Sequence, residues 1–285
     1  MTIAELIRFG VNLSMALMVF CVALHRGTSP LKFAFTEPRL LARSLLAMYV
    51  AMPLVAVAIA LNFELSHALK VALILLALSP VPPILPKKEI EAGGSRRYVL
   101  ALLGVASLVA IIVVPAGLEL ISRIFGLDLM IPLFVTAKVV ATSVLLPLVA
   151  GLVVARLAPA FAEKVAGPLA IAATVLLLAL FLPMLFVARH AVFAQFGNFT
   201  IGAIIVFSLV GLAVGHLSGG PVAGNRTALA LATATRHPGV ALAVLHAVAP
   251  HDQGVTPVVL LYLLVSSIVS LPYVAWRKRA IAKTA

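Results

Sequence analysis

The sequence has little charge and almost no cysteine for its length. Only 11% of its 285 residues are Asp, Glu, Lys or Arg, and Cys21 is the single cysteine. One cysteine inside an apolar stretch gives no disulfide framework and no cysteine-based metal site. The sequence also lacks His-Glu-x-x-His, Gly-x-Ser-x-Gly and phosphate-binding glycine motifs. We therefore expect no enzyme, no metal centre, no bound cofactor and no nucleotide-driven pump.

Long polar segments are also lacking. The chain is 63% hydrophobic, and its mean hydropathy is +1.20. Apolar runs of about 20 residues alternate with short polar linkers, as in helices that cross a bilayer. The net charge of +12 could suggest a nucleic-acid partner. The placement of the cations in loops favours a membrane protein instead, so we expect the lipid bilayer as partner and no nucleic acid.

The pattern predicts an all-α polytopic membrane protein with about nine transmembrane helices in a single membrane domain, 1–285. The predicted spans are about 3–24, 40–62, an irregular segment at 67–97, 98–122, 129–155, 164–188, 196–217, 226–250 and 255–276.

Lysine and arginine residues are distributed unequally between the two sides. Of the cations outside the spans, only four fall on the side of the N-terminus: Arg8, Lys70, Arg123 and Arg189. The others fall on the side of the C-terminus, and such excess marks the cytoplasmic face. We therefore expect the N-terminus outside, the C-terminus inside and a multi-pass protein of the cell (inner or plasma) membrane.

The span 226–250 has a charged and broken centre. Arg236 lies about 15 Å into the bilayer on a helix that starts at Arg226, where a cation costs ~3 kcal/mol. Pro238 cannot continue the helical hydrogen bonds, it biases His237 away from helix, and Gly239 tolerates the resulting angles. A break at this depth must be buried in protein or face water. The stretch therefore predicts a binding site.

Arg236 has no acidic partner within a span, because all the acidic residues lie near span ends or in loops. It is a candidate substrate-binding or coupling group, and the alternative is a structural cation on carbonyl groups freed at the two breaks; both roles can hold, since a fixed positive charge could stand in for a bound sodium ion. His237 is a candidate proton carrier, with a neutral hydrogen-bonded ring as the alternative. Thr233 and Thr235 either donate to a substrate or bond to their own helix.

The segment 67–97 contains a second break. Its apolar run ends at Ser79, and four prolines follow: Pro80, Pro82, Pro83 and Pro86. No α-helix continues through such a cluster. The chain either leaves the membrane there as a cytoplasmic turn or breaks near the midplane, with 87–91 in a short second half.

Each broken segment is followed by one more span, so the two halves resemble inverted repeats. Paired interrupted helices in inverted repeats indicate the midplane site of a secondary transporter. We therefore assign the substrate or ion site to Ser79, Pro80, Pro82, Pro83, Thr233, Thr235, Arg236, His237, Pro238 and Gly239. Asn12, Ser107 and Lys138 are additional polar candidates within spans, where such residues also serve to join helices.

Four stretches are similar to the bile acid:sodium symporter superfamily. They are RTALALATATRHPGVALAV, KVVATSVLLPLVAGLVVARLAP, AMYVAMPLVAVAIAL and LSMALMVFCVAL. The resemblance implies two discontinuous helices that cross in a core lobe, here about 40–122 and 196–276, and a panel lobe, about 1–39 and 129–190. It also implies sodium-coupled uptake of organic anions.

The sequence departs from the family pattern at the sodium-binding positions. Ala232 stands where the resemblance implies a glutamate, and Arg236 and His237 stand where it implies a Gln-Asn pair. We therefore expect a symport-type secondary transporter of a small organic anion with little sodium dependence, and a proton is the other candidate coupling ion. The alternative is a non-transporting membrane sensor or assembly subunit. The substrate and the oligomeric state stay open.

Overall fold

Every regular element that the structure describes is a helix. The computed structural model describes residues 3–24, 33, 35–82, 84–125, 133–196, 199–248 and 254–282. Its elements are α1 (Ile3–Ala23), α3 (Pro38–Leu46), the π-helical turn η1 (Ala47–Ala51), α4 (Met52–Asn62), α5 (His67–Leu78), α6 (Leu85–Glu91), α7 (Arg96–Phe125), α8 (Leu133–Val140), the π-helical turn η2 (Ala141–Leu145), α9 (Leu146–Leu157), α10 (Pro159–Val187), α11 (Arg189–Phe193), α12 (Thr200–Ser218), α13 (Ala223–Ala234), α14 (Pro238–Val248) and α15 (Val255–Ala282).

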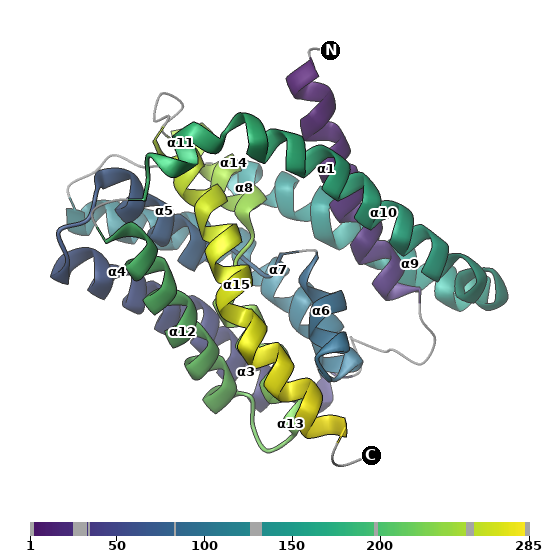
Figure 1. The fold of residues 1–285 in the computed structure, drawn as a ribbon. Coiled ribbons are helices and arrows are strands. Elements are labelled where there is room, and N and C mark those ends of the chain that lie inside the picture. The colour runs from purple at the N-terminus through teal and green to yellow at the C-terminus, as the bar shows by residue number, and fades with distance from the viewer. Residues whose placement is uncertain are drawn as a thin grey trace.

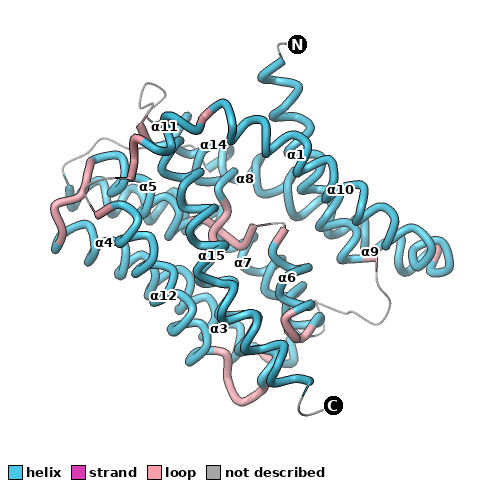
Figure 2. The backbone as a smooth tube through the Cα atoms, viewed as in Figure 1, coloured by secondary structure: helices cyan, strands magenta, loops and turns pink. Residues whose placement is uncertain are grey.

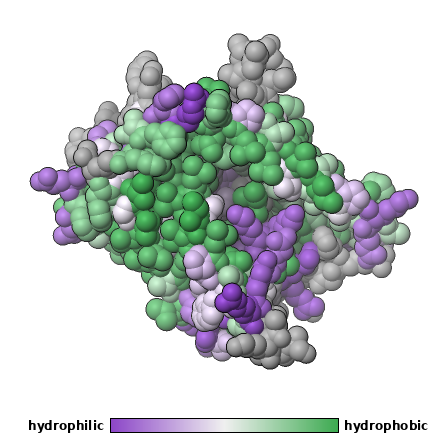
Figure 3. All heavy atoms as spheres, viewed as in Figure 1, coloured by the Kyte–Doolittle hydropathy of each residue, from purple (hydrophilic) through white to green (hydrophobic). Residues whose placement is uncertain are grey.

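The described helices are long and apolar enough for a polytopic membrane protein. Seven stretches in this part of the chain qualify as membrane spans by length and composition, and Phe9–Ala23 and His67–Leu78 are shorter apolar helices. Large apolar side chains such as Leu54, Ile112 and Leu217 are exposed. Figure 3 shows a broad hydrophobic surface over the helices. A water-soluble monomer rarely exposes so much apolar surface, so these faces suit lipid.

The predicted helix ends differ from the observed ones by a few residues. The helix predicted from 164 begins at Pro159, because proline suits the first turn, where its missing N–H is not needed. The last helix continues beyond 276 to Ala282 in spite of Pro272. The irregular segment 67–97 resolves into α5, a break, the short helix α6 and the start of α7.

Two groups of helices are visible in the fold. Helices α1, α9 and α10 pack against one another and lie side by side in Figure 1. Helices α12, α13 and α15 pack together, and α5 packs against α4, α7 and α15. The largest buried apolar cluster is centred on α3–α7 and α12–α15 and also takes in residues of α1, α8, η2, α9 and α11. The two termini lie at opposite ends of the molecule in Figure 1.

The packing of α12 on α13 depends on two glycines. A Cβ at Gly211 would lie 2.8 Å from the Cα of Ala234, and one at Gly215 would lie 2.6 Å from the Cα of Ala230. Real Cβ atoms do not approach backbone so closely, so these positions need glycine for the two helices to touch. This contact holds the end of α13, and therefore the second break, against α12.

Candidate functional site

The two sequence-predicted breaks meet inside the molecule. The α5 helix ends at Leu78, where Ser79 turns to an extended conformation, and α13 ends at Ala234 with Thr235 extended. The backbone N–H of His237 donates to the carbonyl oxygen of Pro80 at 3.0 Å. Figure 2 shows these non-helical stretches in the interior of the helical bundle. The breaks are thus joined backbone to backbone.

Arg236 lies fully buried between the breaks, with an exposed fraction of 0%. Its Nη1 donates to the carbonyl oxygen of Ser79 at 3.3 Å, and its Nη2 donates to that of Met48 at 2.5 Å. No salt bridge to Arg236 occurs among the described residues, and its Nε has no partner there. Carbonyl dipoles therefore compensate its charge in the place of a carboxylate.

The Met48 carbonyl is free to accept because of a π-helical turn. In α-helical geometry it would accept from the N–H of Met52, but that N–H donates to Ala47 across η1. One residue further along the chain is Pro53, which has no N–H. The Met48 carbonyl therefore lacks a donor from its own helix, and the Arg236 guanidinium supplies one.

Neighbouring helices hold the end of α13 in place. The Tyr262 hydroxyl of α15 donates to the carbonyl oxygen of Ala234 at 2.7 Å. The Thr233 hydroxyl donates to the carbonyl oxygen of Gly211 on α12 at 2.6 Å and also lies 2.7 Å from that of Leu229 in its own helix. Both side chains are fully buried. Tyr262 thus satisfies a carbonyl group at the interrupted end of α13, which lacks a donor from its own helix, and Thr233 ties this end to α12.

The His237 ring caps the helix that follows the break. Its Nδ1 accepts from the backbone N–H of Val240 at 3.3 Å, and α14 starts at Pro238. A ring that accepts at Nδ1 is neutral and carries its proton on Nε2. The Nε2 is buried without a partner among the described residues. A Cβ at Gly239 would lie 3.0 Å from this ring.

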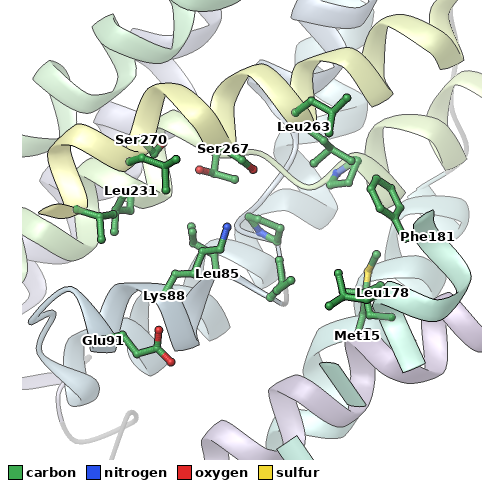
Figure 4. A pocket seen from close by; sticks show the side chains of 18 of the residues that line it. Met15, Leu85, Lys88, Glu91, Leu178, Phe181, Leu231, Leu263, Ser267 and Ser270 are labelled. Carbon is green, nitrogen blue, oxygen red and sulfur yellow. The ribbon is translucent and has the colours of Figure 1, made fainter. Parts of the chain in front are cut away.

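A cavity of about 430 Å³ lies beside the two breaks. Pro82 and Ile84 of the first break and Thr235 and Pro238 of the second contribute to its wall. Met15, Leu177, Leu178 and Phe181 form the opposite wall from α1 and α10. Figure 4 shows these side chains around the cavity. Its volume lies in the range of small-molecule sites.

Apart from Thr235, the polar side chains that line the cavity come from α6 and α15. Lys88 and Glu91 project from α6, and Ser267, Ser270 and Lys278 project from α15. In Figure 4 the Lys88 side chain extends into the cavity towards α15. Hydrophilic residues also gather over α6 in Figure 3. The cavity wall is therefore mainly apolar and carries two ammonium groups and one carboxylate.

The predicted site residues differ in how they lie relative to the cavity. Pro82, Thr235 and Pro238 line the cavity. Ser79, Pro80, Thr233, Arg236 and His237 are buried and do not line the cavity, and Gly239 is half-buried beside the His237 ring. Of the additional candidates, Asn12 and Lys138 are exposed, and Ser107 is buried within α7. Pro83 lies outside the described residues.

Sequence reasoning missed the polar side chains that line the cavity from α6 and α15. They are Lys88, Glu91, Ser267, Ser270 and Lys278. A spacing of three places Leu85, Lys88 and Glu91 on one face of a helix, and Ser267, Ser270 and Val274 share a face of α15. This spacing is visible in the sequence. The sequence left open whether 87–91 is a cytoplasmic turn or a short helix in the membrane, so α6 was not assigned to the site.

A comparison with models of known protein families shows the family to which the chain belongs. The model described as the Sodium Bile acid symporter family matches residues 12–196. The chain belongs to the sodium bile acid symporter family. The prediction of this family from the sequence is confirmed, and membership makes the chain a multi-pass helical protein of a transporter family.

The family match covers the first break and ends before the second. Residues 79–84 lie inside the matched range, whereas Arg236 and the cavity-lining part of α15 lie outside it. No curated protein matches the chain. The description of the second break as part of a site therefore rests on its contacts with Ser79, Pro80 and Met48.

Proposed function

We propose that this symporter-family protein is a secondary transporter of a small organic anion. The observation that carries the proposal is the cavity at the two breaks, with Lys88 and Lys278 in an otherwise mainly apolar wall. An ammonium group attracts an anion, and apolar walls bind a hydrocarbon body. The cavity has one more cation than anion, so a singly charged organic anion would neutralise it.

Alternating access suits the position of the cavity. One wall comes from α1 and α10, and the other comes from α6, α13–α15 and the breaks. We propose that these walls belong to a panel lobe (about 1–39 and 129–190) and a core lobe (about 40–122 and 196–276) that move against each other. Nine crossings, inverted repeats, an outside N-terminus and an inside C-terminus complete this proposal, in which Lys88 and Lys278 mark the cytoplasmic end.

Arg236 takes the place of a coupling sodium ion in this proposal. Sodium is a hard cation that needs several oxygen ligands. The carbonyl oxygens of Ser79 and Met48 already accept from the guanidinium. A permanent cation here gives the breaks the positive charge that a bound ion would bring, so transport would not depend on sodium.

Uptake into proteoliposomes tests the function. We would screen radiolabelled taurocholate together with smaller aromatic and aliphatic carboxylates against wild type, Lys88→Gln and the matched control Lys87→Gln, whose side chain is exposed on the same helix. The loss of a charge-assisted contact of ~1.5–3 kcal/mol predicts roughly tenfold or greater weakening in KM for Lys88→Gln alone.

Two results would contradict the proposal. One is the absence of flux for every anion in the screen, which would favour a membrane sensor or assembly subunit. The other is equal weakening by Lys88→Gln and Lys87→Gln, because only the first residue lines the cavity.

A further inference from the structure

Glu89 is a buried acidic residue that the cavity does not use. It lies on α6 between Lys88 and Ile90, and only 1% of it is exposed. Its Oε1 is buried and has no hydrogen-bond partner among the described residues. No salt bridge to it occurs in this part of the chain. Buried polar atoms are normally satisfied, so this one needs an explanation.

No cation of the described residues forms a salt bridge with Glu89, and this includes Arg96 and Arg97 at the start of α7. The α6 helix packs against α7, α13 and α1. From α7, Tyr98 is its electrostatic neighbour, and the Tyr98 hydroxyl is hydrogen-bonded to Ser44 at 2.6 Å. From α13, the Nε of Arg226 donates to the carbonyl oxygen of Gly220 instead.

The remaining neighbours are neutral or face elsewhere. Asn225 of α13 is buried with an Oδ1 that has no partner among the described residues. From α1, Met15 and Met18 pack in an apolar cluster with Ile84. On α6 itself, Lys88 and Glu91 are exposed side chains that line the cavity.

An ionised carboxylate is therefore costly at this position. A buried charge without a partner costs several kcal/mol, whereas a protonated carboxyl is neutral and has an O–H to donate. In the conformation described, Glu89 holds a proton. The proton can leave only when α6 moves away from α7 and α13 and water reaches the side chain.

The α6 helix contains Glu89 and also forms part of the wall of the substrate cavity. Lys88 projects into the cavity, and Glu89, the next residue, points into the packed core. A movement of α6 that hydrates Glu89 would therefore also change the cavity at Lys88. We propose that Glu89 is the proton-binding site that couples anion transport to a proton gradient.

This proposal rests on the proposed transport function. In this proposal the protein is an electroneutral symporter. One proton on Glu89 crosses the membrane with each singly charged anion, and both are released on the same side. His237 is the other buried titratable side chain at the breaks that could carry a proton. Its Nδ1 accepts from Val240, so a second ring proton would remove the cap of α14.

Infrared spectroscopy of the purified protein tests proton binding directly. We expect a carbonyl stretch of a protonated carboxyl at neutral pH in wild type and in the control Glu64→Gln, whose side chain is exposed. The band should be lost in Glu89→Gln. Its absence from the wild-type protein would overturn the proposal without reference to any variant.

Taurocholate accumulation in sodium-free proteoliposomes tests coupling. With an acidic exterior, wild type and Glu64→Gln should accumulate taurocholate about tenfold for each pH unit, since a tenfold ratio corresponds to ~1.4 kcal/mol. Glu89→Gln should equilibrate taurocholate without accumulation. Proton-driven accumulation by Glu89→Gln would refute the coupling role. If wild type moved no anion of the uptake screen while the infrared band depended on Glu89, the carrier function would fail and the buried proton site would stand.

Discussion

Arg236 shows how a membrane protein can hold a buried cation without an acidic partner. Its guanidinium bonds to backbone carbonyls from two separate segments, Ser79 after α5 and Met48 in η1. Each carbonyl lacks a helical donor, one because the helix ends and the other because of the π-helical turn before Pro53. Cation and carbonyls thus satisfy one another, and the two breaks become a single unit.

Replacement of Arg236 should destabilise the protein. Arg236→Gln leaves at least one buried carbonyl without a donor and removes a charge-assisted bond, which predicts a loss of about 2–5 kcal/mol. Thermal unfolding in detergent measures the change. Arg189→Gln is the control, since Arg189 is partly exposed and its contacts in the described part of the chain are with the carbonyl oxygen and the ring of Phe186, at the end of the preceding helix α10. Equal unfolding temperatures for the two variants would argue against a structural role of the guanidinium.

For single residues, the sequence indicated where Arg236 and the breaks lie along the chain but not which groups they contact. The depth of Arg236 and the break at Pro238 follow from residue spacing. The Met48 acceptor depends on a π-helical turn that hydrophobic periodicity does not reveal. Glu89 stands in a charged run that predicts solvent exposure, yet packing against α7 and α13 buries it.

At the scale of elements, the second break depends on how closely α12 approaches α13. The two helices touch because Gly211 and Gly215 have no side chains, and the Thr233 hydroxyl bonds across the contact. The first break was predicted from the proline cluster after Ser79, and the second was predicted from Pro238 and Gly239. Their hydrogen bond through Pro80 and His237 was not, since pairing of distant segments is a property of tertiary structure.

A methyl group at Gly211 should separate these helices. Gly211→Ala places Cβ 2.8 Å from the Cα of Ala234, and such overpacking typically costs about 1–3 kcal/mol. Gly167→Ala is the matched control in α10, because its Cβ meets nothing within 4 Å. We expect a lower unfolding temperature for the first variant and an unchanged or higher one for the second. The reverse order would contradict the role given to this contact.

At the scale of the whole molecule, the charge distribution predicts the orientation in the membrane. The cytoplasmic side is predicted to hold Arg279, and the opposite side is predicted to hold Arg189. Because Cys21 is the single cysteine, its replacement by alanine gives a background without thiols for labelling.

Single cysteines then test this orientation. In that background, a membrane-impermeant maleimide should label Arg189→Cys in intact cells and Arg279→Cys only in inverted vesicles. Arg279 is exposed and Arg189 is partly exposed in the structure, so a maleimide can reach either position from its own side of the membrane. Labelling of Arg279→Cys in intact cells would reverse or refute the predicted topology.

The central claim is that the cavity at the two breaks moves an organic anion, and that Arg236 supplies the charge of a coupling sodium ion. Taurocholate uptake by wild-type proteoliposomes in sodium buffer and in choline buffer, at equal pH and ionic strength, tests it most directly. The account predicts measurable uptake at the same rate in both buffers. Uptake that requires sodium would contradict it.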